Sequence, residues 1–182
     1  MPKAQGKLPT GPDGSILIGL GANLPSERFG PPRQTLEAAI AELAAGGIAL
    51  LKRSRWYESA PIPASDQPWF VNGVAAAETE LDPEALLGRL HEIEAAFGRI
   101  RREINAPRAL DLDLLAFGTL VRHAPPPILP HPRLASRAFV LVPLAEIEPG
   151  WRHPESGLAV ETLIARLPPG QKIRMLEERA PP

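Results

Sequence analysis

The sequence predicts an α+β fold in which strands and helices follow one another in the order β-α-β-β-α-β. Two segments carry apolar residues at helical spacing between a proline-marked start and a glycine-marked end, and four segments carry the apolar or alternating pattern of strands. That order is the order of a ferredoxin-like sandwich, in which helices pack on one face of an antiparallel sheet. The rest of the chain, from Thr119 to Pro182, would be a C-terminal extension of this unit.

The first predicted strand and helix lie between residues 15 and 47. Ser15 to Leu20 reads SILIGL, an apolar run that is typical of a buried strand. The helix would begin after Pro31-Pro32 and end at Gly46-Gly47. Its core-facing positions, at helical spacing, are Leu36, Ile40 and Leu43.

Two further strands and a second helix are predicted from the middle of the chain. Strand-like patterns cover Ile48 to Tyr57 and Val71 to Glu80, and a proline-containing loop separates them. Asp82 as N-cap and Pro83 as first helical residue open the helix, which Gly98 closes. Its core stripe is Leu86, Leu90, Ile93 and Phe97.

The fourth strand, Leu110 to Phe117, carries two aspartates. Because side chains alternate along a strand, Asp111 and Asp113 project together on one face. Mg²⁺ is usually held by one or two carboxylates plus substrate phosphates, and guanidinium groups grip phosphate oxygens. The segment therefore predicts a site for Mg²⁺ and a polyphosphate, although alternating Asp and Leu is also typical of an ordinary half-exposed strand. The arginines that cluster before and beside the pair are Arg99, Arg101, Arg102 and Arg108.

Composition limits the classes of partner. The chain has 182 residues, 44% of them hydrophobic, which is enough for one substantial core. A formal net charge of −1 and a low aromatic content of 5% argue against a general nucleic-acid binder. The absence of cysteine excludes disulfides, thiolate catalysis and thiolate metal sites. The positive charge is local and suits a small anionic ligand.

Residues 1–14 are polar and contain several prolines and glycines, so we expect a disordered N-terminal tail followed by a single domain over residues 15–182. The tail carries no apolar leader segment, and no run of the chain is long and apolar enough to span a membrane. We expect a cytoplasmic protein, a monomer, without a membrane or nucleic-acid partner.

Six separate blocks of the chain carry distinctive residues. They are GLGANL at 19–24, DQPWFVN at 66–72, EAAFGRIR at 94–101, PRALDLDLL at 107–115, PHP at 130–132 and RAFVL at 137–141. Several independent blocks in order are far more specific than any one of them. These blocks occur in the order and approximate spacing of 6-hydroxymethyl-7,8-dihydropterin pyrophosphokinase, and the chain resembles this family from about Ser15 to Pro149.

The resemblance implies a transferase of folate biosynthesis. Such an enzyme moves the β,γ-diphosphate of ATP onto the hydroxymethyl oxygen of the pterin and releases AMP. The resemblance implies ATP as co-substrate and two Mg²⁺ ions, held by Asp111 and Asp113, that bridge the ATP phosphates and the attacking hydroxyl. It also implies catalytic roles for Arg99 and Arg108, which would stabilise phosphate or transition-state charge.

For the pterin, the resemblance implies a pocket formed around the 66–72 block. A flat heterocycle needs amides to read its edge and aromatic rings to stack on, so Gln67 and Asn72 would supply amide contacts. Phe70 and Phe139 would sandwich the ring, with ordinary core packing as the alternative for both. The implied pterin-binding set is Ser59, Ile62, Gln67, Phe70, Asn72, Asp111 and Phe139.

For ATP, the resemblance implies a glutamate near the end of the second helix, a lid over residues 102–106 that closes with the preceding arginine, and a His and an Arg on the triphosphate. A rigid surface turn is the alternative for His131, which two prolines flank. The implied ATP-binding set is Glu94, Arg99, Arg101, Arg108, His131 and Arg137.

Two other functions are compatible with parts of the pattern. A polymerase-β-like nucleotidyltransferase also uses a DxD strand with two Mg²⁺, although Pro107-Arg108 stands where its Gly-Ser or Gly-Gly turn is expected. A non-catalytic ferredoxin-like binding module gives no reason for the aspartates, the arginines and the pterin block to occur together. Gly19-Leu20-Gly21 does not complete a dinucleotide-binding fingerprint, because Leu24 replaces the third glycine, so these glycines are expected to allow close packing at a strand end.

Overall fold

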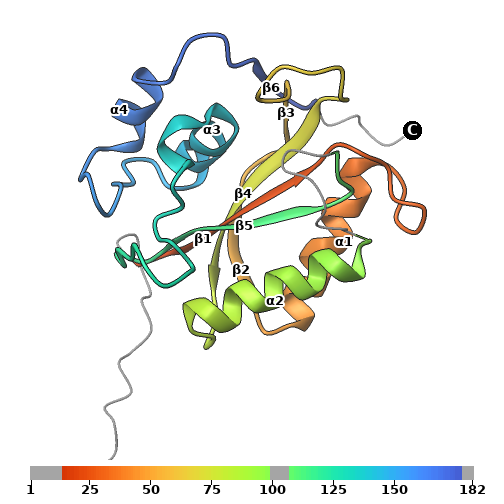
Figure 1. Cartoon of the computed structure of the whole chain (residues 1–182), viewed down its shortest axis with the longest axis horizontal. Coiled ribbons are helices and arrows are strands. Elements are labelled where there is room, and N and C mark those ends of the chain that lie inside the picture. Colours follow the sequence, from red (N-terminus) through yellow and green to blue (C-terminus); the bar gives the residue numbers. More distant parts are fainter. Residues whose placement is uncertain (1–13, 99–106, 178–182) are drawn as a thin grey trace, which may run out of the picture.

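The computed structural model describes residues 14–98 and 107–177, and within them one six-stranded antiparallel sheet lies between two layers of helices (Figure 1). The strand order is β5-β1-β4-β3-β6, and β2 pairs with β4 beside β3. The strands are β1 (Ile16–Ala22), β2 (Ala49–Arg53), β3 (Tyr57–Ser59), β4 (Phe70–Glu78), β5 (Asp111–Phe117) and β6 (Ile173–Met175).

The helices divide between the two faces of the sheet. On one face lie α1 (Pro32–Ala45) and α2 (Pro83–Ala96), and α3 (Ala138–Ile147) packs on the other with α4 (Val160–Ala165) beside it (Figure 1). A short 3-10 turn, η1 (Leu134–Ser136), leads into α3. The apolar run Phe139 to Leu144 of the extension is therefore a helix that contains Pro143.

The predicted ferredoxin-like arrangement is confirmed by the strand path β5-β1-β4-β2 with α1 and α2 on one face. The predicted start of α2 is also confirmed. The Asp82 carboxylate accepts a hydrogen bond of 2.8 Å from the backbone N–H of Ala85, and Pro83 is the first residue of the helix. The C-terminal extension contributes the α3 layer and adds β6 to the same sheet.

The prediction of one strand from Ile48 to Tyr57 is wrong, because this segment forms two strands that pair with different parts of β4. Ser54 lies at the break. Its N–H donates to the Val74 carbonyl and its hydroxyl accepts from the Val74 N–H, so the side chain takes over part of the strand ladder. Trp56 then enters the core, where its indole N–H donates to Glu37 at 2.8 Å.

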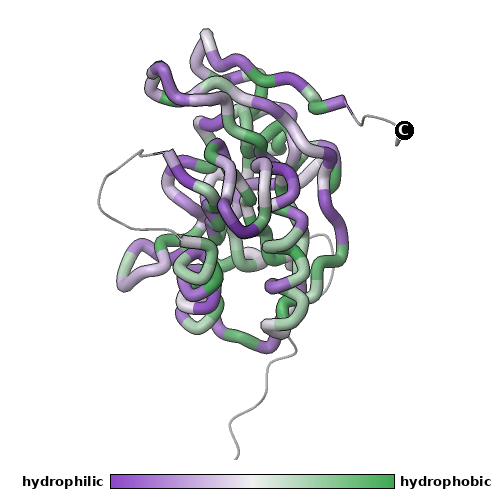
Figure 2. Tube along the Cα trace, turned by 90° about the vertical axis from the view of Figure 1, so that its right-hand side faces the viewer, coloured by the Kyte–Doolittle hydropathy of each residue, from purple (hydrophilic) through white to green (hydrophobic). Residues whose placement is uncertain are grey.

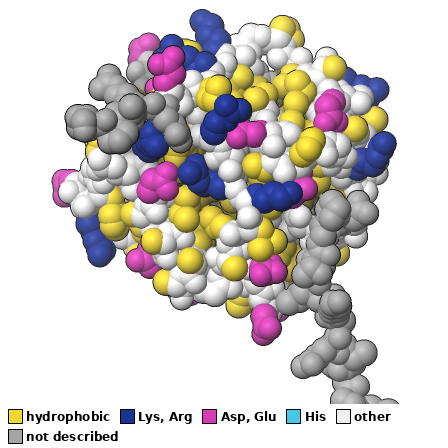
Figure 3. Space-filling view, turned by 180° about the vertical axis from the view of Figure 1, so that it is seen from behind, with side chains coloured by type: hydrophobic (Ala, Val, Ile, Leu, Met, Phe, Trp, Pro, Cys, Tyr) yellow, Lys and Arg dark blue, Asp and Glu magenta, His cyan; other side chains and the backbone are white. Residues whose placement is uncertain are grey.

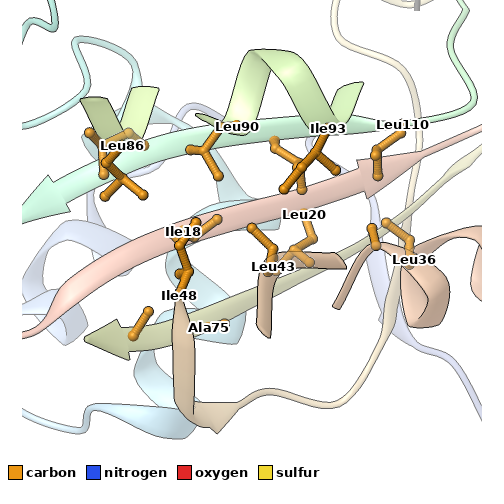
Figure 4. Close-up of a cluster of buried hydrophobic side chains, with 14 of the residues drawn as sticks. Ile18, Leu20, Leu36, Leu43, Ile48, Ala75, Leu86, Leu90, Ile93 and Leu110 are labelled. Atoms are coloured by element: carbon orange, nitrogen blue, oxygen red, sulfur yellow. The ribbon is translucent and has the colours of Figure 1, made fainter. Parts of the chain in front are cut away.

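Two apolar clusters lie on opposite faces of the sheet, because neighbouring residues of a strand point to opposite sides. Even-numbered residues of β1 face α1 and α2, and Leu17 faces α3. The cluster under α1 and α2 includes Ile18, Leu20, Leu36, Leu43, Leu86, Leu90 and Ile93 (Figure 4). The cluster under α3 includes Leu17, Val74, Leu115, Val140, Leu141 and Leu144.

Residue types are interspersed on the visible face of the molecule and along the chain trace. On the face seen in Figure 3, basic and acidic side chains lie close to each other instead of gathering by sign. Hydrophobic and hydrophilic residues alternate over short stretches of the chain trace (Figure 2). Within residues 14–98 and 107–177, none of the helices has the length and apolar character needed to cross a membrane.

Two glycines provide a matched test of this packing. A Cβ at Gly73 would lie 2.8 Å from a ring carbon of Trp56, whereas a Cβ at Gly88 of α2 would meet nothing within 4 Å. We expect Gly73→Ala to lower the free energy of unfolding by about 1–3 kcal/mol, because the buried indole has to move. Gly88→Ala should raise it by roughly 0.5–1 kcal/mol, because alanine favours helix. Urea denaturation of both variants measures these changes, and equal effects would contradict the described packing of Trp56.

Candidate active site

The aspartates of β5 project from the face of the sheet that α3 covers only in part. Gly21 of β1 is paired with Asp111 on one side and with Asn72 of β4 on the other, so these three residues form a row across three strands. Gly19 is paired in the same way with Asp113 and Val74. Residues paired across strands share a face, so both aspartates and Asn72 project from the same side of the sheet.

Glycine between these side chains keeps the row open. A Cβ at Gly21 would lie 3.1 Å from Oδ1 of Asn72, so the amide oxygen lies over the glycine. The amide nitrogen of Asn72 donates to the Ser59 hydroxyl at 2.7 Å, and both side chains are buried. Ser59 and Asn72, which belong to the predicted pterin set, are thus brought together with Gly21 at the centre of the row. The expected close packing at these glycines is confirmed.

Asn23 ties the loop that carries Gln67 to the loop that carries Arg108. It is only 2% exposed, and its amide nitrogen donates to Gln67 Oε1 and to the Pro68 carbonyl, each at 3.1 Å. Its amide oxygen accepts from the Arg108 N–H at 2.9 Å, and its own N–H donates to the Arg108 carbonyl. Asn23 lies in the 19–24 block that the chain shares with the family, and the resemblance did not imply a role for it. No local pattern could show this role, because the partners lie 44 and 85 residues away.

Each aspartate of β5 faces an arginine. Arg108 Nη1 lies 3.2 Å from Asp111 Oδ2, and Arg137 Nη1 lies 3.9 Å from Asp113 Oδ2. Burial lowers the pKa of the Arg137 guanidinium, and the nearby Asp113 charge opposes that effect. Four predicted site residues therefore form one group in which positive and negative side chains alternate. In this group the arginines can bind an anion and the aspartates a cation in place of each other.

His131 reaches the same group from the segment before η1. Its backbone N–H donates to the Leu115 carbonyl of β5 at 2.8 Å, and its Nδ1 accepts from the Arg133 N–H at 3.1 Å. Burial, together with the positive charges of Arg137 and Arg133, lowers the pKa of His131 to about 4. The imidazole is therefore neutral near pH 7. In this state it can form hydrogen bonds but carries no positive charge.

A cleft of about 300 Å³ lies between α2, β5 and the proline-rich segment before η1. Glu94 lines it and is almost fully buried, and its carboxylate accepts a 2.8 Å hydrogen bond from the Leu112 N–H of β5. Asp113 and His131 line the same cleft, so it reaches one of the two aspartates of β5. The other lining residues are Leu87, His91, Leu112, Leu114, Pro126, Pro127, Ile128 and Pro132.

The structure gives fewer contacts for the remaining predicted residues. Ile62 is half exposed, and Phe139 lies on α3 with the Arg137 guanidinium 5.3 Å from its ring centre. Phe70 is the first residue of β4, and a pterin sandwiched between the rings of Phe70 and Phe139 stays a prediction. Arg99, Arg101 and the lid predicted for residues 102–106 lie outside the described residues, as do residues 1–13 of the tail predicted for residues 1–14.

Comparison with protein families identifies the family to which the chain belongs. The model of the 7,8-dihydro-6-hydroxymethylpterin-pyrophosphokinase family matches residues 17–149. The chain belongs to this pyrophosphokinase family. It is therefore a pyrophosphokinase of folate biosynthesis that uses ATP, and neither a nucleotidyltransferase nor a non-catalytic module is favoured.

Relatives with curated names agree with this family. The chain is 42% identical over 152 residues to the 2-amino-4-hydroxy-6-hydroxymethyldihydropteridine pyrophosphokinase of Synechocystis, covering 83% of this chain and 75% of that one. It is 40% identical over 151 residues to the enzyme of the same name from Pseudomonas aeruginosa, covering 82% and 90%. A folic acid synthesis protein of Pneumocystis carinii is 37% identical, but the match spans only 20% of its length.

Solved structures show the same fold. The wild-type HPPK-DHPS of Plasmodium falciparum, crystallised with pteroate, superposes with a TM-score of 0.64 at 12% identity. The match covers 84% of this chain and 44% of the Plasmodium chain, so the pyrophosphokinase fold corresponds to less than half of that longer protein. At such low identity the likeness shows the fold alone.

The neutral His131 predicts a pH dependence of stability in the metal-free protein. The unfolded chain protonates this residue near pH 6.5 and the folded chain near pH 4, so the unfolded state binds more protons in between. Folding stability is therefore expected to fall as the pH drops from about 6.5 toward 4. Urea unfolding with EDTA at several pH values, compared with His131→Asn, measures this contribution, and exposed His123→Asn is the control. An unchanged slope in His131→Asn would contradict the prediction.

Proposed function

We propose that the row across β5, β1 and β4 and the cleft beside it carry out the family's reaction with the residues named above. ATP would bind with its adenosine part in the cleft and its phosphates toward His131 and Arg137. The pterin would lie over Gly21 and Gly19, with its edge against Asn72. The hydroxymethyl oxygen attacks the β-phosphorus, and its proton passes to solvent water. The bond from that phosphorus to the oxygen bridging to the α-phosphorus breaks, and AMP leaves.

The observation that supports this assignment is the position of the two aspartates where the row meets the cleft. Asp113 lines the cleft, and Asp111, two residues away on the same face, lies in the row with Asn72. An attacking hydroxyl at the row and a triphosphate in the cleft would therefore meet beside both carboxylates. Holding two reactants in reacting geometry supplies much of the catalysis in phosphoryl transfer.

The donor set at this junction fits Mg²⁺. Asp111 and Asp113 offer hard oxygen ligands, and the described residues contain no group of three or more His, Asp or Glu that could form a complete protein cage. Two carboxylates completed by substrate phosphates are what Mg²⁺ commonly uses. When bound, two Mg²⁺ ions would neutralise charge on the phosphates and lower the pKa of the attacking hydroxyl.

The arginines would change partners when the substrates bind. In the described state Arg108 faces Asp111 and Arg137 faces Asp113, which keeps both guanidinium groups oriented toward the reacting region. Once the carboxylates serve as metal ligands, Arg108 and Arg137 would turn to the phosphates, which guanidinium groups bind bidentately. Arg99 and Arg101 are proposed to join them from the loop. We also propose that the chain works as a cytoplasmic monomer. Its net charge of −1 supports the further proposal that it has no nucleic-acid partner.

A product assay tests this function. The protein is incubated with ATP, Mg²⁺ and 6-hydroxymethyl-7,8-dihydropterin, and each component is omitted in turn. AMP should form only when all three are present, because the β,γ-diphosphate moves as one unit. Release of pyrophosphate in place of AMP would instead indicate nucleotidyl transfer, and no turnover would reject the assignment.

A substitution separates the metal site from the pterin pocket. We expect Asp113→Ala to lower turnover by at least about a thousandfold while pterin binding stays detectable, because the proposed cation ligand is lost but Asn72 and Ser59 remain. Turnover follows from AMP formation and pterin binding from calorimetry. Exposed Glu80→Ala is the matched loss of a carboxylate and should behave as wild type. Equal losses of pterin affinity and turnover in Asp113→Ala would refute this division of roles.

A further inference from the structure

We propose that Gln171, which lies beyond the family match that ends at residue 149, is a positioning residue for the active site. Its side-chain amide holds the backbone on both sides of Arg137 and so fixes the start of α3. The inference rests on the proposed function, which places Arg137 at the ATP phosphates. It adds to that function a role for the C-terminal extension.

The side-chain amide of Gln171 accepts one hydrogen bond and donates another. The Ala138 N–H donates to Gln171 Oε1 at 2.8 Å, and Gln171 Nε2 donates to the Ser136 carbonyl at 2.8 Å. These two backbone groups flank Arg137 directly. A primary amide carries an acceptor and a donor side by side, so one side chain satisfies both groups. A carboxylate of the same shape could accept from Ala138 but would oppose the carbonyl of Ser136.

The start of α3 needs this support from outside. The first N–H groups of a helix have no partner within the helix, and the residue at the N-cap position usually supplies one from its own side chain. Here Arg137 occupies that position and makes no capping hydrogen bond. Its guanidinium lies instead toward Asp113 and over the ring of Phe139. Gln171 therefore supplies the cap and leaves Arg137 to the site.

The residues that follow Gln171 are held by β3 and the loop after it, which carry Ser59 and Gln67 of the predicted pterin set. The carbonyl of Lys172 accepts a 3.1 Å hydrogen bond from the Ala60 N–H, and β6 then pairs with β3. Arg174 forms a 2.7 Å ion pair with Glu58 of β3, and its guanidinium lies 5.1 Å from the ring centre of Trp69. Residues 171–174 therefore join the start of α3 to the strand and loop that carry Ser59 and Gln67.

Kinetics of three variants test the proposal. Gln171→Ala is expected to lower kcat/KM for AMP formation about tenfold, because both hydrogen bonds beside Arg137 are lost. Gln171→Glu should lose at least as much, since its carboxylate faces the Ser136 carbonyl. Lys172→Ala, which keeps the backbone contact to Ala60, is the matched control and should behave as wild type. Gln171→Met keeps the side-chain length and replaces Gln171→Ala if that variant unfolds at the assay temperature.

A double-mutant cycle with Arg137→Ala distinguishes positioning from a general loss of stability. If Gln171 acts through Arg137, adding Gln171→Ala to Arg137→Ala should change kcat/KM by less than about twofold. A full tenfold loss in both backgrounds, or wild-type kinetics of Gln171→Ala and Gln171→Met, would overturn the proposal. Wild-type kinetics of Arg137→Ala would instead reject the role given to Arg137 under the proposed function.

Discussion

The antiparallel register of β1 with its two neighbours is the constraint on which the site depends. It sets Gly21 between Asp111 and Asn72, so a carboxylate and an amide stand on one face with no side chain between them. Adjacent strands lie about 4.8 Å apart, which separates the outer two backbones of the row by about 10 Å. A shift of one residue would turn the aspartates into the core under α1 and α2. The register therefore fixes the site and the core together.

Opposite charges lie close together around the two aspartates when no substrate is bound. Asp111 and Asp113 each face a guanidinium, and the neutral His131 adds no further positive charge beside them. The same groups are complementary to a magnesium–triphosphate complex, because cation and anion can take the places that arginine and aspartate fill for each other. The same aspartate and arginine charges would thus stabilise the folded protein and bind the substrate.

Much of this arrangement follows from local sequence patterns. Alternation along β5 predicted that Asp111 and Asp113 share a face, and the Asp82 cap with Pro83 predicted the start of α2. The break between β2 and β3 did not follow, because Ser54 hydrogen-bonds to a residue twenty positions away and Trp56 packs on Gly73. The roles of Asn23 and Gln171 depend on contacts between distant loops, which leave no periodic signal in the chain.

The most direct test of the account is a crystal structure of the chain with 6-hydroxymethyl-7,8-dihydropterin, Mg²⁺ and a non-hydrolysable ATP analogue. The account predicts the pterin ring over Gly21, between Asn72 and Asp111, with the metal ions on Asp111 and Asp113 and the triphosphate directed toward His131 and Arg137. A pterin bound in the cleft beside Glu94, or metal ions away from both aspartates, would contradict it.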